Sequence, residues 1–159
     1  MLRALEIAPT TRSRSVLLEV LGRRQAKSAV PTIVRYLSNR SPRVRGEAAD
    51  ALIHIGDVGD PHVGPILLQR IEGKERREGM HSTLALALAA VRYRPAIPVL
   101  IRSLSSKNEV VRRCAAFALS DLGATEAIGA LRKAIEQEDD LSTRIQLVRY
   151  LEQLLGAST

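Results

Sequence analysis

A pairing of one arginine with a leucine seven residues later recurs along the whole 159-residue chain. The successive arginines are separated by 31, 32, 35 and 32 residues. The arginines are Arg14, Arg45, Arg77, Arg112 and Arg144, and their leucines are Leu21, Leu52, Leu84, Leu119 and Leu151. A fixed period of this length is typical of solenoids, in which each unit buries its apolar face only against its neighbours. The chain is therefore predicted to fold as a repeat array.

Each arginine also marks a stripe of apolar residues. Positions three and four beyond it read Leu17/Leu18, Ala48/Ala49, Met80/His81, Ala115/Ala116 and Leu147/Val148. Apolar residues at +3, +4 and +7 lie on one face of an α-helix. This stripe predicts the first helix of each unit, helix A.

A second aligned segment follows each of the first four stripes. It reads AVPTIVRYL, VGPILLQRI, AIPVLIRSL and AIGALRKAI, beginning at Ala29, Val63, Ala96 and Ala127. Pro31, Pro65 and Pro98 occupy one equivalent position, and Gly129 takes that position in the fourth segment. Proline is tolerated in the first turn of a helix, so these residues predict the start of a second helix, helix B.

The predicted fold class is all-α, an α-solenoid of about four helix pairs with partial helices at both ends. Residues 1–159 form one domain, with units at 10–40, 41–73, 74–106 and 107–139 and a closing helix at 141–155. Leu2–Ile7 resembles the end of a B helix, because Leu5 lies 32 residues before Leu37. Incompletely capped ends leave self-association through the solenoid ends open as one mode of assembly.

Composition limits the core and the class of partner. The chain has no Trp and one Phe, so the core is predicted to be aliphatic. Its 24 Lys and Arg against 17 Asp and Glu give a formal net charge of +7, which favours nucleic acid, acidic proteins or anionic surfaces as partners. The single cysteine fits a reducing compartment, and no apolar run has the length of a membrane span. A cytoplasmic location is expected.

Two segments carry a family resemblance. VRGEAADALIHIGDVGDPHVGPILLQRI and VVRRCAAFALSDLGATEAIGALRKAI resemble HEAT-like repeats of the phycobilisome-lyase type, in which V-R-x-x-A-A-x-A-L-G-x-L-G-D precedes A-V-P-x-L. The first and third units match more loosely, with Ser13 and Arg76 where that pattern has Val. The resemblance implies the solenoid fold. It does not select a function, because such repeats occur in scaffolds, adaptors, bilin lyases, hydroxylases and DNA-repair proteins.

Enzymatic members of that group have signatures that this chain lacks. Deoxyhypusine hydroxylases place His-Glu iron ligands early in their A helices, where this chain has Gly46-Glu47, Glu78-Gly79 and Arg113-Cys114. HEAT-like DNA glycosylases use tryptophans to hold a damaged nucleotide, and there is no Trp.

The histidines and the cysteine also form no recognisable site. His54, His62 and His81 have no metal-ligand spacing with one another or with Cys114, whose alanine neighbours indicate packing. We therefore predict no catalytic residues, no metal and no cofactor.

A row of cations on the B helices is the best candidate site. Alignment on the prolines brings Arg35, Gln69, Arg102 and Lys133 to one position, with Tyr36, Arg70 and Arg132 beside them. The resemblance implies that B helices line the concave surface, so these side chains are expected to form a ladder that binds a polyanion. The alternative is that they only solvate an exposed face. Tyr36 and Tyr93 are candidate contact residues, because Tyr is enriched at binding hot spots.

The A-helix arginines are interpreted differently. Their strict recurrence suggests hydrogen bonds to carbonyls or carboxylates of the adjacent unit, a task that suits a planar guanidinium. The leading hypothesis is thus a non-enzymatic scaffold or adaptor whose concave face binds an acidic segment of a protein partner. A nucleic-acid-binding solenoid that contacts phosphates is the alternative, and an accessory subunit of a bilin-lyase-like or other enzyme is a further one.

Overall fold

The computed structural model describes residues 2–56, 63–73 and 80–156, and within these ranges all regular secondary structure is helical. Short 3₁₀ turns precede three of the α-helices. The elements are α1 (Leu2–Ile7), α2 (Thr11–Arg23), η1 (Lys27–Ala29), α3 (Val30–Tyr36), α4 (Pro42–Ile55), α5 (Val63–Glu72), α6 (Met80–Ala90), η2 (Arg94–Ala96), α7 (Ile97–Ser103), α8 (Glu109–Asp121), η3 (Thr125–Ala127), α9 (Ile128–Glu136) and α10 (Leu141–Gly156).

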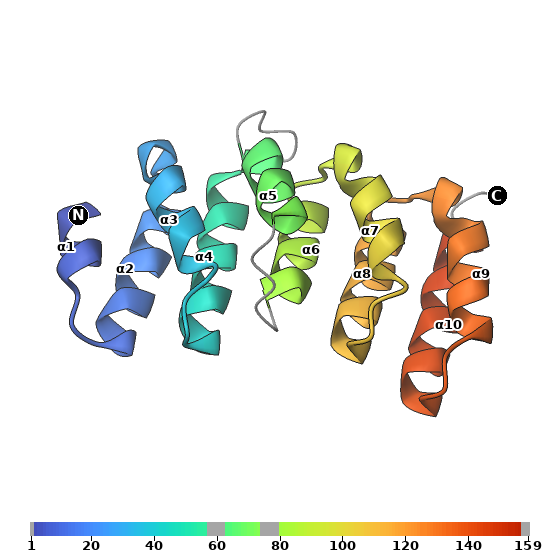
Figure 1. Ribbon diagram of the computed structural model, residues 1–159. Helices are drawn as coiled ribbons and strands as arrows, with labels where there is room; N and C mark the ends of the chain where they lie inside the picture. The colour runs from blue at the N-terminus through green and yellow to red at the C-terminus, as the bar shows by residue number, and fades with distance from the viewer. Residues whose placement is uncertain (1, 57–62, 74–79, 157–159) are drawn as a thin grey trace.

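The helices form two layers that run side by side along the array (Figure 1). The A helices α2, α4, α6, α8 and α10 pack successively on one another, and each B helix packs on the A helix that follows it. The B helices α3, α5, α7 and α9 contact one another much less. This arrangement is an α-solenoid, so the predicted fold class is confirmed. None of the helices in the described part of the chain is long and apolar enough to cross a lipid bilayer.

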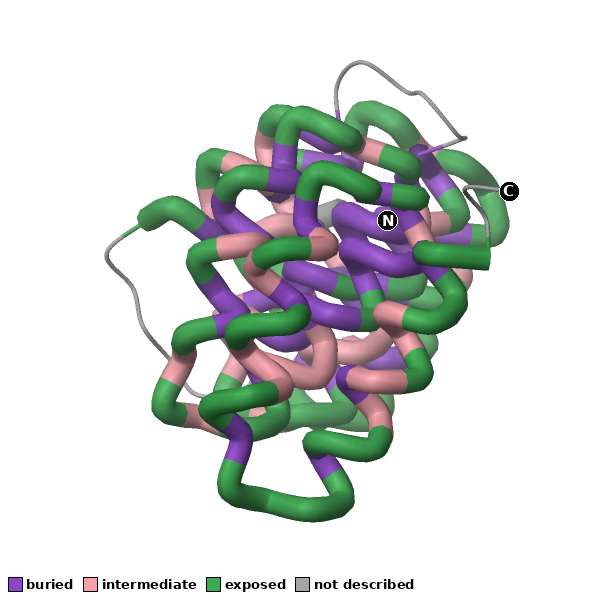
Figure 2. Tube along the Cα trace, turned by 90° about the vertical axis from the view of Figure 1, so that its right-hand side faces the viewer, coloured by how far each residue is buried: buried purple, intermediate pink, exposed green. Residues whose placement is uncertain are grey.

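The core is a continuous aliphatic layer between the two rows of helices, seen as the buried interior in Figure 2. Leu18, Leu52 and Leu119 are completely buried. Alanine and glycine let the A helices approach closely: a Cβ added to Gly22 of α2 would lie 2.7 Å from the Cα of Ala51 in α4. Tight A–A packing therefore depends on small residues at this contact.

The A–B turns after α2, α6 and α8 share one backbone motif. In each turn a backbone N–H donates to the carbonyl five residues earlier, at 3.0 to 3.1 Å. The donor and acceptor are Ala26 and Leu21, Tyr93 and Leu88, and Ala124 and Leu119. The residue before each donor has a positive φ: 48° at Gln25, 55° at Arg92 and 61° at Gly123. These are Schellman ends, which terminate helix A and satisfy its last carbonyls. Only one of the three uses glycine.

This turn corrects the register of the third unit. Leu88, not Leu84, accepts the same turn hydrogen bond as Leu21 and Leu119, and is therefore their structural equivalent. Seven residues earlier, the position of the repeat arginine is taken by His81. The predicted pairing of Arg77 with Leu84 is displaced by four residues, and Arg77 itself lies outside the described residues.

The corrected register explains the third unit's core. Positions +3 and +4 become Leu84 and Ala85, which are 0% and 2% exposed, in place of Met80 and His81. His81 is half-buried, as the repeat arginines Arg45 and Arg112 are. The third A helix therefore follows the same apolar pattern as the others.

The helix starts agree with the sequence prediction. Pro31 and Pro98 lie in the first turns of α3 and α7, and Pro65 lies in the first turn of α5. Asn108, directly before α8, accepts hydrogen bonds from the amides of Val110 and Val111 at 2.9 and 3.3 Å. A side-chain oxygen at this position satisfies amide groups that the helix itself leaves unpaired.

Candidate functional site on the B-helix face

The repeat arginines bind the loops between units. Arg45 donates to the carbonyls of Asn39 and Arg40 at 3.0 and 3.2 Å, and Arg112 donates in the same way to Ser106 and Lys107 at 2.8 and 3.2 Å. Arg144 donates to the carbonyl of Glu138 at 2.8 Å. In each case the guanidinium reaches the carbonyl six residues earlier. It thereby fixes the loop that leads into its own helix. Asn39, Ser106 and Glu138 each lie at the end of the preceding unit, so these bonds run to carbonyls of the adjacent unit, the kind of acceptor expected for these arginines.

Arg112 also reaches a carboxylate, that of Glu138 at the end of its own unit. Its Nε and terminal nitrogen each lie 2.7 Å from an oxygen of Glu138, which is 3% exposed. The hydrogen bond from Arg112 lowers the pKa of Glu138, and the same bond raises the pKa of Arg112. The pair therefore links α8 to the loop before α10. Arg14 is half-buried, and no such bond involves it in the described part of the chain.

The predicted cationic row lies on the B helices, but two of its members are paired with glutamates. Arg35 of α3 lies 3.7 Å from Glu6 of α1, and Arg102 of α7 lies 3.2 Å from Glu72 of α5. In both pairs the glutamate lies in the last turn of the helix that precedes the arginine's helix in the B layer. Exposed pairs of this kind contribute little to stability, about 0 to 1 kcal/mol. Their main effect is to neutralise the positive charge of Arg35 and Arg102.

The other members of the row differ in their surroundings. Arg70 of α5 is half-buried and donates to the hydroxyl of Ser38, which again belongs to the preceding unit. Gln69, Arg132 and Lys133 are exposed, and within the described residues no ion pair involves Arg132 or Lys133. The free positive charge of the row therefore lies on α9.

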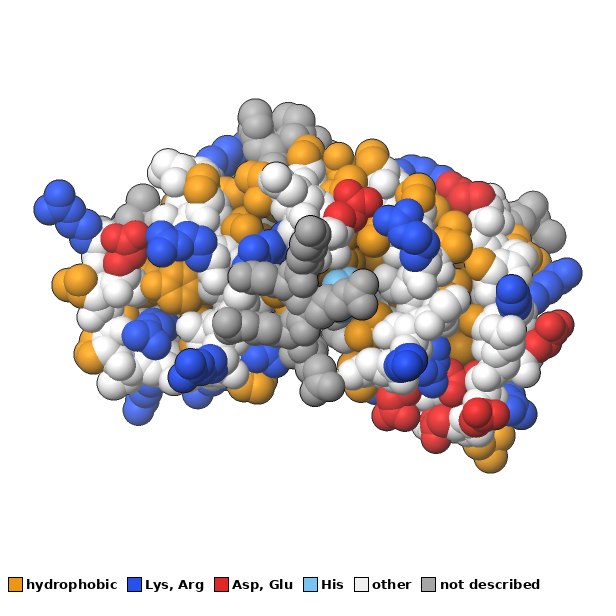
Figure 3. Space-filling model, viewed as in Figure 1, with side chains coloured by type: hydrophobic (Ala, Val, Ile, Leu, Met, Phe, Trp, Pro, Cys, Tyr) orange, Lys and Arg blue, Asp and Glu red, His pale blue; other side chains and the backbone are white. Residues whose placement is uncertain are grey.

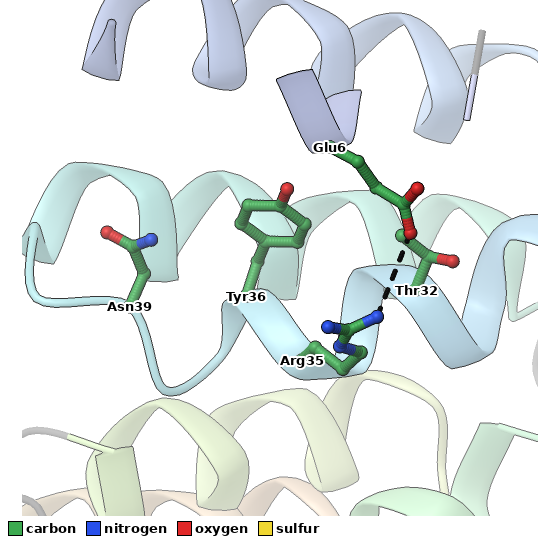
Figure 4. Close-up of a pocket in the computed structure, with 5 residues that line it drawn as sticks. All are labelled: Glu6, Thr32, Arg35, Tyr36 and Asn39. Carbon is green, nitrogen blue, oxygen red and sulfur yellow. Dashed lines mark ion pairs between the residues drawn. The ribbon is translucent and has the colours of Figure 1, made fainter. Parts of the chain in front are cut away.

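A polar hollow of about 500 Å³ lies at the N-terminal end of this face, lined by Glu6, Thr32, Arg35, Tyr36 and Asn39. Figure 4 shows Arg35 turned toward Glu6 and the ring of Tyr36 extending from α3 toward α1. The Tyr36 hydroxyl donates to the carbonyl of Leu5 at 2.9 Å, and the side chain is half-buried. Tyr36 thus ties α1 to α3, and less of its ring is open to a partner than we expected.

A second hollow, of about 550 Å³, lies between α7 and η3, the turn that leads into α9. Its floor is apolar: Pro95, Ile97, Pro98 and Ile101. Arg94 and Glu126 flank it, with 3.1 Å between a guanidinium nitrogen and a carboxylate oxygen, and Arg94 also donates to the carbonyl of Leu122 at 2.7 Å. Sequence reasoning missed this hollow because the segment from Ala96 predicted only a B helix and not the space beside it.

Tyr93, the other predicted contact residue, packs inward. It is half-buried, and a Cβ added to Gly64 of α5 would collide with its ring. Gly64 therefore makes room for Tyr93 between the second and third units. This contact indicates a packing role at the A–B turn.

Among the described residues, His54, His81 and Cys114 form no metal-binding cluster. Within the described residues no group of three or more His, Cys, Asp or Glu side chains is placed to hold a metal ion. The Nδ1 atom of His54 lies 2.7 Å from the carbonyl oxygen of Asp50, one turn earlier in α4. Burial raises the pKa of the Cys114 thiol, so the thiolate form is disfavoured. His62 lies outside the described residues.

Comparison with known families fits this geometry. The family model for HEAT repeats matches residues 2–81 and 65–152, which together span nearly the whole chain. The chain belongs to the HEAT-repeat family. The match is to the HEAT repeat in general and does not select the phycobilisome-lyase type. No curated protein matches the sequence. HEAT repeats suggest a repeat scaffold for protein interaction.

Proposed function

We propose that this HEAT-repeat protein is a non-enzymatic scaffold that binds a protein partner across its B-helix face, defined here as the exposed residues of α3, α5, α7 and α9. The observation that supports this proposal most directly is the pairing of the cationic row with glutamates. Arg35–Glu6 and Arg102–Glu72 leave little free charge on most of the face. A partner must therefore be recognised there by more than a phosphate backbone.

Contacts between proteins combine an apolar centre with a polar rim. The hollow formed by Pro95, Ile97, Pro98 and Ile101 offers such a centre, and the Arg94–Glu126 pair offers part of such a rim. Figure 3 shows this mixed character, with apolar side chains between scattered Lys and Arg on the same side of the molecule. We infer that one apolar side chain of the partner enters this hollow.

The positive charges of Arg132 and Lys133 favour a partner with acidic residues. Both are exposed on α9, the helix that follows the hollow, and within the described part of the chain no carboxylate pairs with either. Electrostatic complementarity mainly sets specificity and association rate. The proposed ligand is accordingly a segment with an apolar anchor next to acidic residues, bound across α7 and α9.

The test begins with partners captured from the native host and identified by mass. The identified segment is then made as a peptide, and its affinity for the wild-type chain is compared with that for R132E/K133E and for Ile101→Asp. We expect either change to weaken binding by about tenfold or more, because each removes a central contact. R24E/R149E is the matched control, since it alters net charge equally but lies outside the B helices.

Two results would contradict the proposal. One is unchanged affinity in both B-face variants while their helical content is intact. The other is an equal loss in the control, which would show that only overall charge matters. The enzyme-subunit alternative would gain support if the wild-type protein co-purified stoichiometrically with a chromophore-bearing or catalytic protein and bound it independently of Ile101 and Lys133.

A further inference from the structure

A second basic surface lies on a different part of the molecule, the edge at which the A helices begin. We propose that this arginine edge, formed by Arg12, Arg14, Arg40 and Arg43, binds the sugar–phosphate backbone of duplex nucleic acid without regard to sequence. It is a separate surface from the B-helix face.

The fold brings these four residues together. Arg12 and Arg14 lie in the first turn of α2, Arg43 lies in the first turn of α4, and Arg40 lies just before α4. The two helices pack directly on each other and start at the same edge of the array (Figure 1). Arg12, Arg40 and Arg43 are exposed, and Arg14 is half-buried.

No carboxylate in the described part of the chain neutralises these cations. In the described residues the guanidinium groups of Arg12, Arg14, Arg40 and Arg43 make no hydrogen bond or ion pair, in contrast to the paired arginines of the B helices. The first turns of α2 and α4 contain no acidic residue. Residues 2–56 carry ten Lys or Arg against four Asp or Glu, a net charge of +6.

Stability does not account for this arrangement. The start of a helix carries partial positive charge, so cations there are unfavourable for the helix itself. Like charges on two neighbouring helices add mutual repulsion. At the other end of the array the same edge carries both signs of charge: Glu109 begins α8 and Asp139 and Asp140 precede α10, but Lys107 and Arg113 lie beside them. Figure 3 shows Lys and Arg without Asp or Glu at the lower left, and Asp and Glu mixed with Lys and Arg at the lower right.

The surroundings favour phosphate over an acidic protein. Thr11, Ser13, Asn39 and Ser41 lie among the arginines. Arginine with hydroxyl and amide side chains is the usual set that contacts phosphate and sugar oxygens. No aromatic residue lies between 8 and 15 or between 38 and 47, so this edge lacks both the anchors typical of protein interfaces and the rings on which single-stranded bases stack.

The test is fluorescence anisotropy with a labelled mixed-sequence duplex at several salt concentrations, beginning at about 50 mM. The wild-type chain is compared with R12E/R40E/R43E and with R3E/R24E/R149E, which has the same net charge and leaves the B-helix face unchanged. We expect the edge variant to bind at least about tenfold more weakly and the slope of log affinity against log salt to shrink by roughly 2 to 3, because about three phosphate contacts are lost. The control should retain most of the affinity.

Three outcomes would overturn the proposal: no binding by the wild type at the lowest salt, equal loss in both triple variants, or tighter binding of a polyglutamate chain than of the duplex. If charge reversal reduces helical content, R12Q/R40Q/R43Q replaces it, with the same comparison. None of these outcomes depends on the B-helix face, so the two proposals fail separately.

Discussion

Arg112 and Glu138 form a two-point ion pair in which both nitrogen–oxygen distances are 2.7 Å. The Arg112 side chain is 18% exposed and that of Glu138 is 2% exposed. The Glu138 carboxylate also accepts a hydrogen bond from the amide of Asp140 at 3.2 Å, while its backbone carbonyl accepts from Arg144. One residue therefore fastens the loop between α9 and α10 to two A helices.

Loss of one partner of this pair should destabilise the array. In Glu138→Ala the Arg112 guanidinium keeps its bonds to Ser106 and Lys107 but loses its buried counter-charge. Such a loss costs about 3 to 5 kcal/mol in the free energy of unfolding. The control R112M/E138L, which removes both charges, should lose much less. Urea denaturation followed by circular dichroism measures both, and equal losses in the two variants would contradict the prediction.

The same pair predicts a dependence of stability on acid. Hydrogen bonding from Arg112 holds the pKa of Glu138 below its ordinary value of 4.5, and hydrogen bonding from Thr143 holds the pKa of Asp140 below 3.8. Groups with a lowered pKa in the folded state stabilise the protein above the unfolded value, and this contribution is lost as pH falls through the folded value. The free energy of unfolding should therefore be steady from neutral pH to about 5 and decline below 4.5.

Glu138→Gln tests which group is responsible. The variant cannot lose a carboxylate at this position, so its free energy of unfolding should fall less steeply between pH 4.5 and pH 3 than that of the wild type. Urea denaturation at a series of pH values gives both curves. Parallel curves for the two proteins would assign the acid sensitivity to other carboxylates.

The A–B turns allow a stabilising substitution. Gln25 has a φ of 48° at the end of α2, in the conformation that Gly123 adopts with a φ of 61° after α8. A residue with a side chain is disfavoured there by about 1 kcal/mol relative to glycine. Gln25→Gly should raise the free energy of unfolding by about this amount, and Gly123→Ala should lower it similarly. Thermal denaturation of both variants checks the prediction, which fails if their effects have the same sign.

How much of this structure was predictable depends on whether a feature repeats. The helix pairs and the aliphatic core follow from apolar spacing and from Pro31 and Pro98, which mark the same point in two units. The third register was misplaced because Arg77 and Leu84 imitate the repeat spacing. The apolar pair Leu84 and Ala85, set against His81, was the available signal.

The charges of the candidate site were harder to predict. Alignment of the B helices brought Arg35 and Arg102 to one position, but the pairing with Glu6 and Glu72 depends on where the preceding helix ends. Glu6 and Glu72, which lie near the ends of the preceding helices in the sequence, were a usable signal of this pairing. The hollow at Pro95 and Ile101 was not predictable, because its depth depends on how far α7 and α9 stand apart.

The close packing of the A helices should make Gly22 intolerant of any side chain. A Cβ there would lie 2.7 Å from the Cα of Ala51 and 3.2 Å from its Cβ, and backbone atoms cannot move aside as a flexible side chain can. Gly22→Ala should therefore reduce the free energy of unfolding by about 1 to 3 kcal/mol, as overpacking does. Gly46 in α4 is the matched control, since nothing lies within 4 Å of its added Cβ. Gly46→Ala should stabilise the helix by about 0.8 to 1 kcal/mol through backbone entropy alone. Urea denaturation of the two single variants compares them directly, and a stabilised Gly22→Ala protein would show that α2 and α4 do not approach as closely as the structure places them.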